Sequence, residues 1–494
     1  MKNRYLYILP ALALALASCE PSFDNEVDNG IYSSGEADFS TYVALGNSLT
    51  AGFMDGTVFK SGQENSFPNI LSKQFAVVGG GVFTQPSYAD DTNNLGGLLF
   101  GGAPVAGTRL IINMATGSPE NLKGTPTIEI SKLQAKAYNN MGIPNAKSFH
   151  LLLPNYGNVS GIISGTANPY FVRQATSPTV SVLDDAMSLN PTFFTNWIGN
   201  NDVLSYSTSG GVGAVSGVGA NDITTLSVFK ESYEKIIEVL TSKGAKGVVA
   251  TIPDVTAIPF FTTVPYNPVP LDAANAAALN AGYAQYNGGL AMALGAGALT
   301  QEEVTQRTIK FVAGKNAVVI EDKFLTNLSA MGLPNYRQAT AEDLLVLTSQ
   351  SVIGKPVGED PTKLNGVSVP LADQWVLSKD EIAIAKKATI DFNEIIKAAA
   401  ASKNLAVVDM NAVLNKAVSG LRAEDGQIYT ADYFKGLGNL STVMFSLDGV
   451  HLNARGYAFV ANEILQTINM HYKSKIPLVN PATYSGPTLL PNNN

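Results

Sequence analysis

Short apolar runs alternate along the chain with longer segments in which apolar residues recur every three or four positions. The runs at Tyr42–Leu45, Thr192–Ile198, Gly247–Ile252 and Leu405–Met410 have few polar residues, and the first three lead directly into a Gly or a Pro. Apolar runs of this length, bounded by such residues, are typical of strands buried in a parallel sheet. We therefore expect at least these four strands.

The longest amphipathic segment is Asp222–Lys243. Its apolar residues fall on one face of a helix: Leu226, Phe229, Tyr233, Ile236, Ile237 and Leu240. Further helices are predicted at Phe67–Phe75, Asp272–Leu294, Lys379–Ser402 and Gly456–Tyr472. Strands that alternate with helices imply a parallel sheet covered on both faces. The pattern thus predicts an α/β fold with three α/β/α layers, formed by one domain over residues 41–475.

Some stretches lack this periodicity. Residues 76–135, which are rich in Gly and Asn, and residues 310–370 are expected to be long loop insertions in the domain. The acidic stretch Glu20–Ser40 is predicted to be a flexible tether, and the Pro-rich residues 476–494 a poorly ordered tail.

Composition excludes several classes of function. The formal net charge of the 494-residue chain is −8 and Lys and Arg form no cluster, so we expect no nucleic-acid partner. A single Cys and three His residues argue against zinc and other His- or Cys-rich metal sites. We expect neither a metal nor a cofactor, and the sequence leaves the oligomeric state open.

The only cysteine lies at the end of a leader-like segment. Lys2 and Arg4 precede a short apolar run that ends in Leu16-Ala17-Ser18-Cys19. This ending resembles a bacterial lipobox, which implies that residues 1–18 are removed as a signal peptide and that Cys19 is lipidated. The anchor would hold the protein at the bacterial cell envelope, expected at the outer membrane and facing either the periplasm or the outside.

Candidate catalytic residues follow the predicted strands. Ser48 lies in Gly46-Asn47-Ser48-Leu49, at the carboxyl end of the first strand, where open parallel sheets place their sites. Serine needs a base, and Asp448-Gly449-Val450-His451 offers one just before the last helix. An Asp three residues before a His can hold its Nδ1–H and leave Nε2 free to take the serine proton. Asn201, in Gly199-Asn200-Asn201-Asp202, offers an amide for an oxyanion.

Together these three segments resemble the motif blocks of the SGNH/GDSL hydrolases, in the same order and at corresponding places in the fold. The resemblance implies an SGNH-like domain in which Ser48 is the nucleophile, His451 the base and Asp448 its orienting partner. It also implies an oxyanion hole made by the Ser48 N–H, the Asn201 side chain and a backbone N–H from a second block. Asn47 stands where the family usually has Asp.

The second block is the least regular match. The nearest segment is Gly142-Ile143-Pro144-Asn145-Ala146, with Asn145 in place of the family's Gly, and Asn158 is a weaker rival. Asn145 keeps the backbone N–H, and Asn tolerates positive φ better than most residues. Asn145 is therefore the expected third oxyanion donor.

Each assignment also has a simpler structural interpretation. Ser48 could cap a helix, His451 could be a structural partner of Asp448, and Asn201 could be a turn residue. Their joint occurrence favours a serine ester hydrolase acting on acyl or acetyl esters of glycans or lipids through an acyl-enzyme. The alternative is a non-catalytic envelope lipoprotein that binds glycan or a partner protein. The acyl length and the exact ester stay open.

Overall fold

The protein is a mixed α/β protein built around a five-stranded, all-parallel sheet. The computed structural model describes residues 32–422 and 426–490. In spatial order the strands are β17 (Ala406–Val408), β8 (Lys246–Ala250), β7 (Phe193–Trp197), β1 (Tyr42–Gly46) and β6 (Asn140–Gly142). All residues of the central strands β1 and β7 are buried. This agrees with their largely apolar sequences, which are typical of strands covered on both faces.

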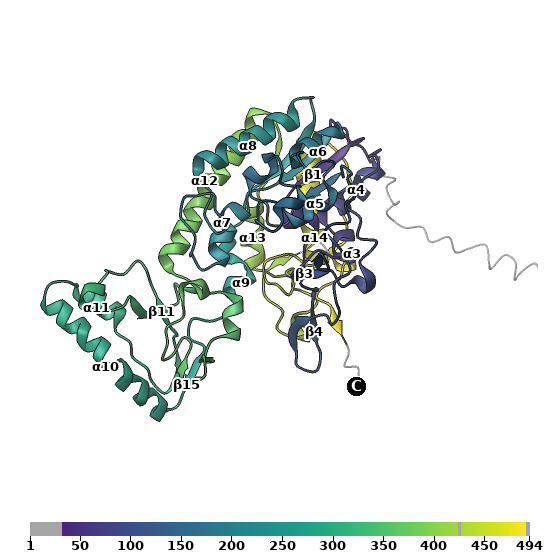
Figure 1. The fold of residues 1–494 in the computed structure, drawn as a ribbon. Coiled ribbons are helices and arrows are strands. Elements are labelled where there is room, and N and C mark those ends of the chain that lie inside the picture. Colours follow the sequence, from purple (N-terminus) through teal and green to yellow (C-terminus); the bar gives the residue numbers. More distant parts are fainter. Residues whose placement is uncertain (1–31, 423–425, 491–494) are drawn as a thin grey trace, which may run out of the picture.

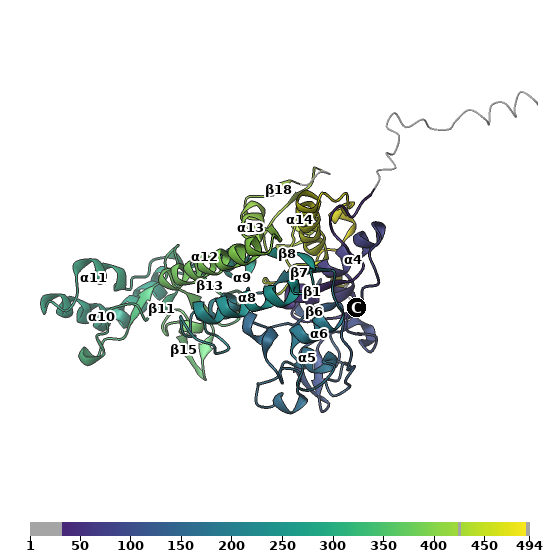
Figure 2. The same ribbon diagram turned by 90° about the horizontal axis from the view of Figure 1, so that it is seen from above.

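Helices cover both faces of this sheet (Figures 1 and 2). Successive side chains of a strand point to opposite faces, so the strands contribute alternate residues to two apolar cores. The core on one side also holds α8 (Leu226–Thr241) and α12 (Lys379–Ser402), and the other holds α4 (Phe67–Val77) and α14 (Ala454–Tyr472). The first core receives Val43, Leu45, Phe194 and Val249, and the second Tyr42, Ala44, Phe193 and Val248.

The strand order fixes where a site can form. The chain passes from β1 to its neighbour β6, crosses to β7 on the opposite side of β1, and continues outward through β8 and β17. The direction of winding therefore reverses at β1. Crevices at the carboxyl ends of the strands beside such a switch point are the usual ligand sites of open parallel sheets.

Most predicted helices and strands are present with shifted ends. α12 begins at Lys379 as predicted, because Ser378 and Glu381 form a capping box around its first turn. α8 begins at Leu226 rather than Asp222. The Asp222 carboxylate instead accepts hydrogen bonds from the N–H groups of Ala214 and Gly219, which holds the preceding loop. The described residues outside 264–377 form the body of the protein. Its remaining helices are α2 (Ser48–Ala51), α3 (Lys60–Glu64), α5 (Pro169–Gln174), α6 (Val182–Ser188), α7 (Asn201–Thr208), α9 (Pro259–Thr262) and α13 (Met410–Val418).

Residues 264–377 form a lobe that extends from the body (Figure 1). It has its own apolar core, and it includes the predicted helix near 272–294 as well as the stretch 310–370. That stretch is not a bare loop, because short antiparallel strand pairs run through it. The elements of the lobe are β9 (Val269–Leu271), α10 (Ala273–Gly295), α11 (Gln301–Arg307), β10 (Gly314–Asn316), β11 (Val319–Glu321), β12 (Tyr336–Gln338), β13 (Leu344–Leu345), β14 (Pro356–Val357), β15 (Asp360–Leu364) and β16 (Val376–Leu377).

The stretch 76–135 also contains regular structure that the sequence pattern did not predict. Two hairpins, β2 (Leu98–Phe100) with β3 (Ala103–Ala106) and β4 (Leu110–Asn113) with β5 (Ser118–Asn121), lie within residues 76–135.

The predicted tail packs on the body over residues 475–490, where β20 (Leu489–Leu490) pairs with β4. The predicted tether is likewise part of the fold from residue 32, because Ser33 pairs with Lys475 and Phe39 is buried. In both segments, scattered apolar side chains such as Phe39 and Ile476 are buried against the body. None of the helices in the described part has the length and apolarity needed to cross a membrane.

Candidate active site

Ser48 is the first residue of α2, directly beyond the carboxyl end of β1. Asn47 caps this helix, because its side-chain oxygen accepts a hydrogen bond from the Leu49 N–H at 3.2 Å. Gly46 has no room for a side chain, since a Cβ there would lie 2.1 Å from Thr50 Oγ1 and 2.7 Å from the Trp197 carbonyl oxygen. The motif residues around Ser48 thus set a tight strand-to-helix turn that holds the serine at the switch point.

The structure brings Ser48, His451 and Asp448 into one hydrogen-bonded series. His451 Nε2 lies 2.8 Å from Ser48 Oγ, across 403 positions of the chain. His451 Nδ1 lies 3.0 Å from Asp448 Oδ2. In this arrangement the imidazole can accept the serine proton while the carboxylate fixes its tautomer and stabilises the imidazolium that forms. The ring of Phe53 packs against the imidazole, with 4.4 Å between the ring centroids.

The Asp448 carboxylate is held in its ionised form. Burial alone would raise its pKa, but the His451 ring and the backbone N–H groups of Val450 and His451 outweigh burial and hold the pKa well below its usual range. Both N–H groups donate to Asp448 Oδ1 at 2.8 Å. Oδ2, which faces the imidazole, also accepts the Gly56 N–H at 3.0 Å. The carboxylate therefore has little freedom to turn away from His451.

Asn201 follows β7, and its side chain reaches the segment after β6 that contains Asn145. The Asn201 amide donates one hydrogen bond to the Ala146 carbonyl at 2.9 Å, and its second N–H has no hydrogen-bond partner in the part of the chain that the structure describes. Asn145 is exposed and has a φ of 64°, so its backbone adopts the conformation for which glycine is usual. Among the described residues its N–H has no hydrogen-bond partner. The N–H of the rival Asn158 is used, because it donates to the Asn155 carbonyl.

The rest of the Gly199–Asp202 motif supports this geometry. Asp202 is fully buried and its carboxylate accepts the N–H and the hydroxyl of Ser148, at 2.8 and 2.7 Å. It therefore ties the segment that follows β7 to the segment that follows β6. Burial raises the pKa of Asp202 to about 6, and the hydrogen bonds from Ser148 oppose that rise. Gly199 has a φ of 117°, which favours glycine.

Sequence reasoning missed the turn at Asp55 and Gly56. Besides the Gly56 bond to Asp448, Asp55 Oδ1 accepts the Leu447 N–H at 3.0 Å, and the Asp55 N–H donates to Ser446 Oγ at 3.0 Å. Three hydrogen bonds thus join the segment after the serine to the segment that carries the base. The Asp-Gly pair signals a turn, but no sequence pattern shows what that turn contacts.

Two further predictions concern lipid and metal. Cys19 lies outside the described residues. Within residues 32–422 and 426–490 there is no group of three or more His, Cys, Asp or Glu side chains placed to hold a metal ion.

Comparisons of the chain with models of protein families, with curated proteins and with solved structures found no match.

Proposed function

We propose that the protein is a serine ester hydrolase of the SGNH/GDSL type, with a three-layer α/β/α domain. The observation that carries the proposal is the hydrogen-bonded series Ser48–His451–Asp448 at the switch point of the sheet. A serine that only capped a helix would have no need of a histidine on its hydroxyl, nor of a buried carboxylate behind that histidine. By its resemblance to a lipobox, Cys19 would anchor the enzyme at the bacterial envelope.

The reaction starts when Ser48 Oγ attacks the ester carbonyl carbon and passes its proton to His451 Nε2. The Ser48 N–H, the Asn145 N–H and the free N–H of the Asn201 amide would then stabilise the tetrahedral oxyanion. The Ser48 N–H suits this role because the first N–H groups of a helix have no partner within the helix. His451 then protonates the leaving alcohol, and an acyl-enzyme remains on Ser48. Water, activated by His451, attacks the acyl carbon and releases the acid.

The test is hydrolysis of p-nitrophenyl butyrate together with labelling by a fluorophosphonate, which reacts with activated serines. We expect Ser48→Ala to abolish labelling and to lower kcat by about 10⁴-fold or more, and His451→Ala to do nearly the same. Combining the two changes should cost little more than either alone, because the residues act as a unit. Asn201→Ala should lower kcat by about 10²–10³-fold. Ser61→Ala, in the neighbouring helix α3, is the matched control.

Hydrolysis by Ser48→Ala at the wild-type rate would refute the assignment of the nucleophile. If the wild-type protein neither hydrolyses any ester nor takes up the probe, the site is not catalytic. A lipoprotein that binds glycan or a partner protein through the same fold would then be the better account.

A further inference from the structure

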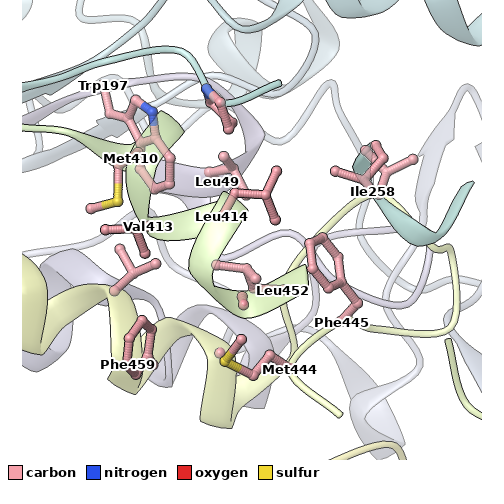
Figure 3. A pocket seen from close by; sticks show the side chains of 15 residues that line it. Leu49, Trp197, Ile258, Met410, Val413, Leu414, Met444, Phe445, Leu452 and Phe459 are labelled. Atoms are coloured by element: carbon pink, nitrogen blue, oxygen red, sulfur yellow. The ribbon is translucent and has the colours of Figure 1, made fainter. Parts of the chain in front are cut away.

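An apolar cavity of about 80 Å³ is lined in part by residues that are adjacent in the chain to Ser48 and His451, and Figure 3 shows its lining. It is at the carboxyl edge of β7, β8 and β17, between α13, α14 and the segment that carries His451. Trp197 follows from β7, Met410 and Val413 come from α13, and Phe459 from α14. The cavity is therefore on the same edge of the sheet as Ser48, on the side of β1 opposite β6.

Chain neighbours of the triad line this cavity. Leu49 directly follows Ser48, and Val450 and Leu452 flank His451. Figure 3 shows Leu49 and Leu452 among the side chains that surround the hollow. Ser48 and His451 are thus each adjacent in the chain to residues of the lining.

The chemistry of the lining selects the occupant. None of the 15 lining residues has a charged or hydroxyl-bearing side chain, and the indole N–H of Trp197 is the one polar side-chain group among them. A sugar placed there would lose hydrogen bonds to water without replacing them, at a large cost in free energy. A hydrocarbon chain has no hydrogen bonds to water to lose. It also fills the cavity, and an empty apolar cavity destabilises a fold in proportion to the cavity volume.

We propose that this cavity holds the acyl chain of the ester, so that the enzyme prefers acyl groups of about four to six carbons over acetyl. The cavity has about half the volume of an apolar protein cavity of about 150 Å³ that holds the six carbons of benzene, so it takes about three carbons. The carbonyl carbon and up to about two further carbons would lie between the cavity and Ser48, which gives the proposed range. The alcohol part of the ester then lies outside the cavity. The inference rests on the proposed function, because it concerns the substrate of that site.

The first test is a series of p-nitrophenyl esters from acetate to decanoate. We expect kcat/KM to rise about fourfold for each methylene up to hexanoate, the factor for burying one methylene, and then to level off. Val413→Phe should fill the cavity and lower the ratio of kcat/KM for hexanoate to that for acetate by at least about tenfold. Val413→Ala should enlarge the cavity and move the preference toward longer chains.

Val418→Phe is the matched control, because Val418 is on the same helix but exposed, and it should keep the wild-type profile. Thermal melting shows whether each variant is folded. A second readout needs no turnover. The chain has two Trp residues, so Trp197 is the only indole left in Trp375→Phe. Hexanoate should change its fluorescence emission, and adding Val413→Phe should remove the change.

The outcomes separate the two proposals. If the probe labels Ser48 but acetate is the best substrate and Val413→Phe leaves the profile unchanged, the acyl assignment is wrong and the hydrolase proposal stands. Absence of both labelling and ester hydrolysis overturns the proposed function, and the acyl assignment falls with it.

Discussion

At the residue scale, short polar side chains around the triad hold backbone segments in place. Asn47 caps the helix of the serine, and Asp202 joins the ends of β6 and β7. Asn47 performs its capping through a side-chain oxygen that Asp also has. Asn at this position therefore keeps the cap that an Asp would make.

Asp55 is the residue of this kind with the clearest dependence on pH. Burial raises its pKa to about 7; the hydrogen bond from the Leu447 N–H opposes the rise, Asp448 adds to it and Arg109 reduces it. Tyr433 and Tyr457 also lie near the carboxylates of Asp55 and Asp448.

We therefore predict that Asp55→Asn stabilises the protein above neutral pH. An unfolded Asp has a pKa of about 3.9, so between about pH 4 and 7 the folded state binds more protons than the unfolded state at this residue. Stability contributed by Asp55 is thus lost as pH rises through that window. Urea unfolding should give equal stability for variant and wild type near about pH 4, and a growing advantage of the variant up to about pH 8.

Asn can keep the hydrogen bond from Leu447 and suits the Asp55 φ of 52°, so the comparison isolates the charge. An advantage that is the same at every pH would show that Asp55 does not titrate in this range.

At the scale of elements, the segment Ser446–Asn453 is held from two sides. The Asp55–Gly56 turn holds it from the nucleophile's side, and on another side the Phe260 N–H of α9 donates to the Gly449 carbonyl at 2.8 Å. Gly449 has a φ of 73°, and a Cβ there would lie 2.9 Å from Leu347 and 3.1 Å from the Phe260 nitrogen. This turn therefore requires glycine both for its conformation and for its packing.

We predict that Gly449→Ala lowers kcat by about 10-fold or more, because a displacement of about 1 Å in a catalytic group has a large cost. The rate of fluorophosphonate labelling should fall in parallel, since both depend on the contact between His451 and Ser48. Gly438→Ala is the control, because it lies nearby in the sequence with open space around its Cβ. Wild-type labelling by Gly449→Ala would show that the turn can relax without moving the base.

Elements with strong periodicity could be predicted from the sequence, and those formed by distant pairing could not. α12, α14 and the strands β1, β7, β8 and β17 follow from apolar patterns and caps within each segment. β6 was missed, because its Asn140-Met141-Gly142 has no strand-like pattern and is buried only by its neighbours. Ser48, His451 and Asp448 were predicted from their motifs, and the structure places them in contact. The Asp55–Gly56 contact joins residues 392 positions apart, which no local pattern encodes.

At the scale of the whole molecule, the chain divides its apolar cores between the body and the lobe. The apolar core of the lobe is separate from the two cores beside the sheet. Trp375 packs against the lobe core and also against the core that contains α8 and α12. Within the lobe, Arg337 is buried between two buried carboxylates. Its guanidinium lies 2.6 Å from Asp322 and makes two contacts of 2.7 Å with Asp343. The sequence did not predict this arrangement, because the lobe is built from strands of two to five residues.

We predict that Arg337→Leu destabilises the lobe and leaves the active site assembled. Removing one partner of a buried ion pair costs about 3–5 kcal/mol, because the remaining charges stay buried without compensation. Scanning calorimetry should then show an early transition for the lobe and a later one near the wild-type temperature for the body. Fluorophosphonate labelling of Ser48 should persist between the two. The control is Lys363→Ala, which removes an exposed ion pair with Asp360 worth about 0–1 kcal/mol. A single transition that moves to lower temperature and takes labelling with it would show that lobe and body unfold as one cooperative unit.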